Sequence, residues 1–134
     1  MSLKGKTAVI TGGSGTVGSG IVHQFLQEGA KVIAPVRTEK GRQALLKDLE
    51  KLHYKIDIAK NLVILVVGNY DSPEKMEKLA TEISYVHPEI NHIVSCFGGD
   101  FEKALHRNYI LMMSMTLSTE PYHTYFLHKR SFLY

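Results

Sequence analysis

The sequence TGGSGTVG, residues Thr11 to Gly18, is a glycine-rich loop that follows a short apolar run and opens an amphipathic segment. It contains the pattern G-x-G-x-x-G as Gly13, Gly15 and Gly18, and the pattern G-x-x-G-x-x-G when counted from Gly12. Glycine at these positions permits a tight turn, a close approach of the backbone to a pyrophosphate, and close packing of a helix on a strand. The loop therefore predicts a dinucleotide site at a helix N-terminus.

Four short apolar runs, mostly rich in Val and Ile, are spread along the first hundred residues. They are KTAVIT (Lys6 to Thr11), KVIAPV (Lys31 to Val36), NLVILVVG (Asn61 to Gly68) and NHIVSCF (Asn91 to Phe97). Their composition is typical of strands that are buried on both faces of a parallel sheet.

Segments with helical periodicity separate these runs. The first carries apolar residues at helical spacing and ends before Gly29; the second, around Ala44 to Leu52, is less regular. The third has an apolar stripe and opens with Ser72 as an N-cap and Pro73 at the first helical position. The stripes consist of Val17, Ile21, Val22, Phe25 and Leu26 in the first helix, and Met76, Leu79, Ala80, Ile83 and Val86 in the third.

Alternating strands and helices predict right-handed βαβ units and one α/β domain over residues 1–134. We expect a Rossmann-like three-layer fold with about four parallel strands in the order 3-2-1-4. Residues 100–115 fit either a helix or a strand. The final segment, PYHTYFLHKRSFLY, predicts a C-terminal helix.

The composition indicates a packed globular protein, since 44% of its 134 residues are hydrophobic and 22% are charged. The net charge of +3 arises from scattered basic residues, which argues against nucleic-acid binding. The single Cys96 excludes an internal disulfide, and the first residues lack the apolar core of a signal peptide, so we expect a cytoplasmic location. No apolar run is long enough to suggest a transmembrane helix.

The end of the second predicted strand indicates which dinucleotide binds. An acid there would hold the ribose 2′-hydroxyl of NAD, whereas an arginine would accommodate the 2′-phosphate of NADP. This chain has Val36 followed by Arg37, with Lys40 and Arg42 nearby. We therefore expect NADP(H) in preference to NAD(H), with Arg37 on the 2′-phosphate; a solvated arginine at the start of a helix is the alternative.

The opening GKTAVITGGSGTVGSGIVHQFLQEGAKVI resembles that of the short-chain dehydrogenase/reductase family. The resemblance weakens towards the fourth strand, where Ser95-Cys96-Phe97-Gly98 replaces the family's Asn-Asn-Ala-Gly. Asn69 and Tyr70 stand where the family usually has an acid that contacts adenine and its neighbour, although Asn69 also fits an ordinary turn residue. The resemblance implies that the following residues bind the cofactor: Gly12, Gly13, Ser14, Gly15, Thr16, Val17, Gly18, Arg37, Asn69 and Tyr70.

The pentapeptide YFLHK places Tyr125 four residues before Lys129, which is the spacing of the family's catalytic pair. In the family, a long helix and a fifth strand carrying a serine precede that pair, and the interval after Gly98 is too short for them. Chance is also a sufficient explanation: six of the seven tyrosines have a residue four places on and 12 of the 134 residues are lysine, so about 0.5 such pairs are expected at random (6 × 12/134). The catalytic residues are therefore unknown.

The other candidate sites are weaker. The seven histidines form no ligand set with a Cys or carboxylate at metal-binding spacing, so we expect no metal. Cys96 fits a buried core residue better than a nucleophile.

Three functions remain open: a NADP(H)-binding module that lacks a complete catalytic site, an oxidoreductase whose active site is completed by other residues or another subunit, and a truncated or splice-variant product. We expect a homodimer, through the edge of the fourth strand or through the C-terminal helix, because both would leave surface that half a domain does not bury.

Overall fold

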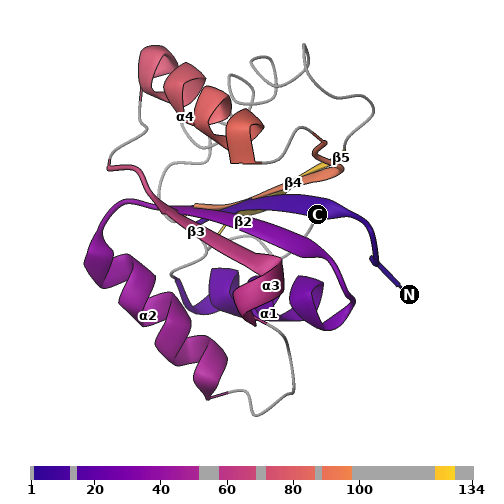
Figure 1. Ribbon diagram of the computed structural model, residues 1–134. Helices are drawn as coiled ribbons and strands as arrows, with labels where there is room; N and C mark the ends of the chain where they lie inside the picture. The colour runs from indigo at the N-terminus through magenta and orange to yellow at the C-terminus, as the bar shows by residue number, and fades with distance from the viewer. Residues whose placement is uncertain are drawn as a thin grey trace.

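The computed structural model describes residues 2–12, 15–51, 58–68, 72–86 and 89–97, together with the backbone of 123–128. Strands and helices alternate along these segments, as the sequence predicts (Figure 1). The strands are β1 (Thr7–Thr11), β2 (Lys31–Val36), β3 (Leu62–Val66), β4 (His92–Phe97) and β5 (His123–His128); the helices are α1 (Thr16–Gln27), α2 (Glu39–Glu50), α3 (Ile58–Asn61) and α4 (Pro73–Val86).

The strands form one parallel sheet in the order β3-β2-β1-β4-β5. The predicted order 3-2-1-4 is confirmed, and the chain adds a fifth strand beyond β4. Figure 1 shows three layers, with α1 and α2 on one face of the sheet and α4 on the other. This arrangement follows from right-handed crossovers, because the connection from β3 back to β4 reverses the direction in which the sheet grows.

Two apolar clusters fill the spaces between the layers. The cluster under α4 is built around Val9, Ile33, Met76, Ile83 and Ile93. The cluster under α1 and α2 is built around Ile10, Val22, Val32, Leu45 and Val94. Neighbouring residues of β1 thus contribute to opposite clusters, which confirms that its apolar run is buried on both faces.

Local signals fix the ends of α1 and α4 where the sequence predicts them. Gly29 has a φ of 91° just after α1, and the N–H groups of Gly29 and Ala30 donate to the carbonyls of Leu26 and Phe25. These paired bonds are those of a Schellman motif. At α4, Ser72 Oγ accepts a hydrogen bond from the N–H of Lys75 at 3.3 Å, which confirms the predicted N-cap.

The second helix begins earlier than predicted, at Glu39 instead of near Ala44. The hydroxyl of Thr38 accepts a hydrogen bond from the N–H of Gly41 at 3.1 Å and caps this first turn. The polar first turn contains Gly41, so it lacks the apolar periodicity by which its start could be recognised. The short helix α3 was likewise not predicted.

The predicted C-terminal helix is wrong over His123–His128, which form strand β5. Thr, Tyr and Phe in this segment favour extended structure, and the backbone of β4 provides hydrogen-bonding groups for a parallel pairing that runs from His92↔His123 to Phe97↔His128. Tertiary pairing therefore overrides the apparent helical period. Because β5 pairs with β4, the fourth strand is not the sheet edge that we expected to drive a homodimer.

Within the described residues, no helix is long and apolar enough to cross a membrane.

Candidate functional site

The glycine loop connects the carboxyl end of β1 to the start of α1, at the edge of the sheet where β2 and β4 also end. Ligands of open parallel sheets bind at this edge, where the direction of the strand order reverses. In this sheet the reversal falls between β1 and β4. The predicted loop therefore lies where ligands of such folds bind.

Two features require glycine at position 12: its backbone conformation and its close approach to β4. Its φ is 73°, which glycine adopts without the steric cost of a side chain. A Cβ at this position would collide with the carbonyl oxygen of Cys96 and lie 2.8 Å from its carbonyl carbon. Because those atoms belong to the backbone of β4, a rotamer change could not relieve the contact. Only glycine brings the loop this close to β4.

Gly15 is the N-cap of α1 and has a different reason to be glycine. Its φ of −81° and ψ of 167° are available to any residue, and a Cβ added here would have the carbonyl oxygen of Gly12 as its nearest atom, at 3.5 Å. No side chain caps the helix at this residue. The N–H groups of the first turn point out of the helix and have no partner within it. Gly15 thus leaves open space beside a helix N-terminus.

The remaining loop residues divide into three groups. Gly18 is buried in the first turn of α1, as expected of the glycine that permits close packing of helix on strand. Val17 is exposed, and the backbone of Thr16 begins α1. Gly13 and Ser14 lie outside the described residues.

Arg37 lies directly after β2 and is exposed, which fits both a 2′-phosphate ligand and a solvated arginine. It precedes Thr38, the N-cap of α2. Arg42, one turn into the helix, donates from Nη1 to Glu39 Oε1 at 2.8 Å. The hydrogen bonds from Gln43 and Arg42 hold the pKa of the Glu39 carboxyl below its ordinary value. Asn69 and Tyr70, which follow β3, lie outside the described residues.

Two hydrogen bonds made by polar side chains join β1 to β4 and to the residue before it, and neither was predicted. The buried hydroxyl of Thr11 donates to the carbonyl of Val94 at 3.4 Å. At the other end of the strands, Asn91 Oδ1 accepts from the N–H of Thr7 at 2.9 Å, and the N–H of Asn91 donates to the carbonyl of Thr7. The signal in the sequence is a polar residue at the boundary of an apolar run. These bonds hold β1 and β4 together on either side of their pairing, and the glycine loop follows β1.

Cys96 packs against the cluster under α1. Burial raises the pKa of its thiol to about 11, so the neutral form predominates at pH 7. Its neighbour Ser95 is also buried. Cys96 is therefore a partly buried residue that packs against the core beside the loop, and it lacks the lowered pKa of a nucleophilic cysteine.

Tyr125 belongs to β5, where it pairs in register with Val94. Lys129 lies outside the described residues. The catalytic motif needs its tyrosine on a helix, one turn from the lysine, and Tyr125 does not meet that condition. The six residues of β5 also contain no serine. Among the described residues, no group of three His, Cys, Asp or Glu side chains could hold a metal ion.

Comparison with known proteins gives consistent matches. The family model of the short chain dehydrogenases matches residues 6–119. The chain is 38% identical over 80 residues to 3beta-hydroxysteroid dehydrogenase 2 of Eggerthella lenta, covering 60% of this chain and 29% of that protein. It is 29% identical over 122 residues to the short-chain dehydrogenase fogG of Aspergillus ruber, covering 82% and 34%.

Solved structures share the fold at low sequence identity. The NADP active-site complex of RhlG from Pseudomonas aeruginosa matches with a TM-score of 0.69 at 17% identity, covering 87% of this chain and 49% of that chain. A metagenomic short-chain oxidoreductase in complex with NADP matches with a TM-score of 0.66 at 18% identity, covering 88% and 57%.

The chain spans about a third of the length of these curated relatives and about half of these solved chains. Residues 6–119, which the family model matches, include the glycine loop and the strands β1 to β4, and the strand order agrees with that of a Rossmann sheet. The chain belongs to the short-chain dehydrogenase family.

Proposed function

We propose that this chain is a single NADP(H)-binding domain without a complete catalytic site of its own. The observation that carries the proposal is the contact of Gly12 with the Cys96 backbone, which holds a glycine loop between β1 and the uncapped start of α1. A pyrophosphate placed there would accept hydrogen bonds from the backbone N–H groups of the loop and of the first turn of α1. Gly13, Ser14, Thr16, Val17 and Gly18 would complete this cradle.

The preference for NADP(H) over NAD(H) rests on the residues that follow β2. Val36 supplies no carboxylate for a ribose 2′-hydroxyl, and the exposed Arg37 can form charge-assisted hydrogen bonds with a 2′-phosphate. Asn69 and Tyr70 would lie near the adenine. Calorimetric titration of the chain with NADPH and with NADH tests this assignment, and NADPH should bind more tightly.

A second candidate is an oxidoreductase whose active site includes residues of another subunit or segment. The strand β5 favours it, because the sheet continues past β4 in the order of a full family member. Yet β5 has no serine, and Tyr125 lies on a strand. A screen for NADPH-dependent reduction of carbonyl compounds separates the two candidates: binding without turnover supports the first, and turnover supports the second.

A homodimer and a cytoplasmic location complete the proposal. The dimer cannot form through an edge of β4, because β5 already pairs with that strand. Light scattering measures the mass in solution. A dimer should give about twice the 15.1 kDa of one chain, and a mass near 15.1 kDa would contradict the proposal.

A further inference from the structure

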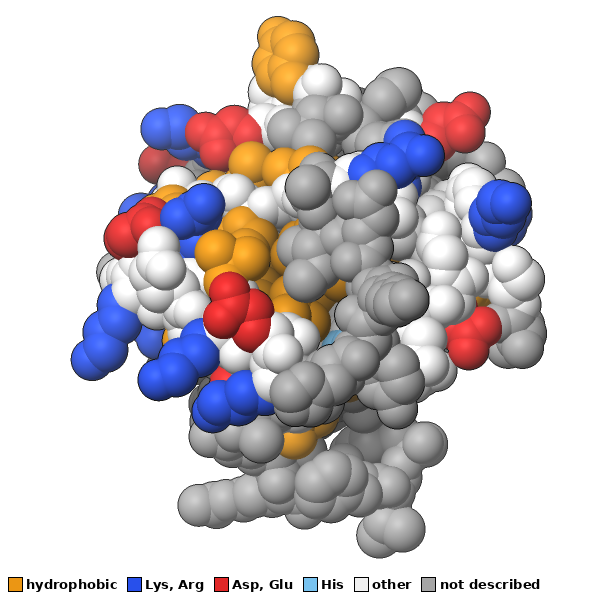
Figure 2. All heavy atoms as spheres, turned by 60° about the horizontal axis from the view of Figure 1, so that its bottom comes forward, with side chains coloured by type: hydrophobic (Ala, Val, Ile, Leu, Met, Phe, Trp, Pro, Cys, Tyr) orange, Lys and Arg blue, Asp and Glu red, His pale blue; other side chains and the backbone are white. Residues whose placement is uncertain are grey.

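The start of α2 concentrates charge beside the proposed 2′-phosphate position. Along the sequence, three cations, Arg37, Lys40 and Arg42, lie within three positions of one acid, Glu39. Figure 2 shows Lys and Arg side chains gathered on the side of the molecule where α2 lies, with Asp and Glu side chains among them. The helix N-terminus adds its own partial positive charge.

Glu39 does not merely share this surface; it is bonded to one of the cations. Its Oε1 accepts from Arg42 Nη1 at 2.8 Å and from Gln43 Nε2 at 3.0 Å. The side chains of Arg42 and Glu39 are 40% and 62% exposed, so both remain accessible to a ligand. Glu39 is ionised at neutral pH, as glutamate ordinarily is, and the hydrogen bonds from Gln43 and Arg42 lower its pKa further.

The fold brings this pair to the edge where the proposed cofactor binds. α2 follows β2 as α1 follows β1, so both helices begin at the carboxyl ends of parallel strands, and they pack against each other. Arg42 lies only one turn from the N-cap Thr38, and its backbone N–H donates to the carbonyl of Thr38 at 3.1 Å. Arg37 and Arg42 therefore both lie near the start of α2, and Glu39 holds the Arg42 guanidinium by a hydrogen bond.

We propose that Glu39 sets the degree of cofactor selectivity by holding Arg42 away from the 2′-phosphate. A carboxylate and a phosphate compete for the guanidinium, and they also repel each other. NADH has no 2′-phosphate and does not enter this competition. The structure therefore assigns Glu39 as a residue that limits the preference for NADPH. This inference rests on the proposed dinucleotide site.

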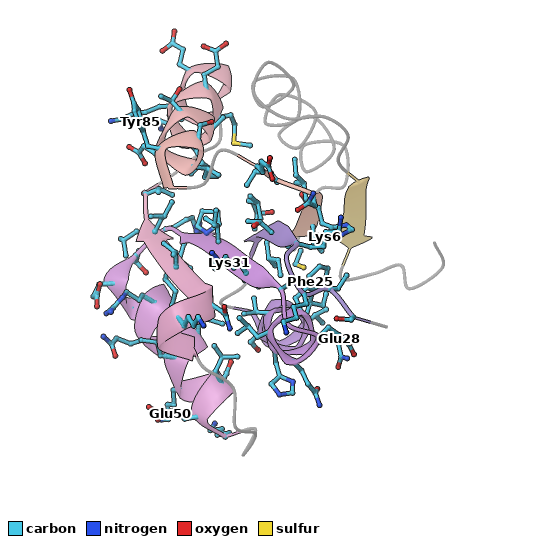
Figure 3. All side chains as sticks on the ribbon, turned by 45° about the vertical axis from the view of Figure 1, so that its right-hand side comes forward. Lys6, Phe25, Glu28, Lys31, Glu50 and Tyr85 are labelled. Atoms are coloured by element: carbon cyan, nitrogen blue, oxygen red, sulfur yellow. The ribbon has the colours of Figure 1, made fainter. Side chains whose placement is uncertain are left out.

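The test compares Glu39→Gln with the parent chain, using calorimetry with NADPH and NADH at low ionic strength. The variant should bind NADPH about threefold to tenfold more tightly and NADH about as before, because an exposed charge is removed and a cation is released. Glu50→Gln is the matched control. Glu50 is the last residue of α2, about 16 Å along the helix from Glu39, and Figure 3 shows it at the far end of the helix.

The double variant Glu39→Gln with Arg42→Ala identifies the mechanism. If Glu39 acts through Arg42, its removal should give less than a twofold gain when Arg42 is already absent. An equal gain in both backgrounds would overturn the inference, as would an unchanged ratio of NADPH to NADH affinity in Glu39→Gln. In those cases the parent still binds NADPH, and the proposed function stands. If the folded parent binds neither dinucleotide, the proposed function fails and this inference fails with it.

Discussion

Gly12 lies against the backbone of Cys96, so closely that a Cβ would meet the carbonyl group of the neighbouring strand. This contact joins the turn after β1 to the end of β4, the two strands that flank the reversal of the sheet. The loop at the proposed phosphate site therefore depends on a backbone-to-backbone approach that a side chain would disrupt.

Replacing Gly12 by Ala should destabilise the fold more than the same change at Gly5. Both have positive φ, of 73° and 82°, and an alanine in that region costs roughly 1–2 kcal/mol. A Cβ at Gly5 would meet no atom within 4 Å, whereas a Cβ at Gly12 would collide with β4. Urea unfolding should give Gly12→Ala a further loss of about 1–3 kcal/mol. Equal losses at the two positions would show that the contact with Cys96 relaxes freely.

Gly15→Val should weaken NADPH and NADH alike at a modest cost in stability, on the order of 1 kcal/mol for a poorer N-cap. The backbone conformation of Gly15 suits any residue, and a Cβ there would make an ordinary contact with Gly12 at 3.5 Å. The added side chain would instead occupy the space that a pyrophosphate needs. Titration with both dinucleotides and a melting curve check this expectation. If the folded variant binds both dinucleotides as tightly as the parent, the pyrophosphate does not bind beside Gly15.

Cys96 should be alkylated slowly at pH 8. With a pKa of about 11 its thiolate is scarce, and iodoacetamide should react roughly a hundredfold or more slowly than with the unfolded chain, whose thiol has a pKa of about 8.5. The rate in the folded protein should rise until about pH 11. A plateau near pH 9 would mean that burial does not raise the pKa.

The same shift affects stability in a defined direction. The folded state keeps the Cys96 proton to a higher pH than the unfolded state does, so the unfolded chain is favoured as the pH rises from its ordinary pKa towards 11. Urea unfolding at several pH values, for the parent and for Cys96→Ala, measures this loss of stability. The variant lacks the thiol, so the difference between the two isolates the contribution of Cys96.

Tyr125→Phe should leave any measurable reductase activity within a few-fold of the parent. Tyr125 lies on β5, opposite Val94, and not on a helix one turn from a lysine. Removal of a general acid would lower turnover by roughly a hundredfold or more. Steady-state assays on the parent and the variant decide the matter, and a loss on that scale would restore Tyr125 as the proton donor.

Much of the fold could be predicted because periodicity and local signals agree. Lys31–Val36 is apolar throughout most of its length and forms β2 with the predicted bounds, and Gly29 and Ser72 mark helix ends through hydrogen bonds to their own neighbours. β5 could not be predicted in this way. Its six residues fit a helix or a strand locally, and the pairing with β4, some thirty positions earlier, decides between them.

The candidate site was predictable to a similar degree. The glycine spacing indicated the loop, and the residue after β2 indicated Arg37. The contact of Gly12 with Cys96 and the bond from Thr11 to Val94 depend on the register of β4 against β1 and on how closely the two backbones approach, which the spacing of residues does not reveal. The pairing of Glu39 with Arg42 depended on the start of α2, whose first turn has no apolar period.

Calorimetric titration of the parent and of Arg37→Ala with NADPH and NADH tests the central claim most directly. The account predicts that the parent binds NADPH more tightly than NADH. It also predicts that Arg37→Ala weakens NADPH by about 1.5–3 kcal/mol, the range for a hydrogen bond to a charged group, and leaves NADH nearly unchanged. Equal losses for the two cofactors, or tighter binding of NADH by the parent, would contradict the assignment of Arg37 to the 2′-phosphate.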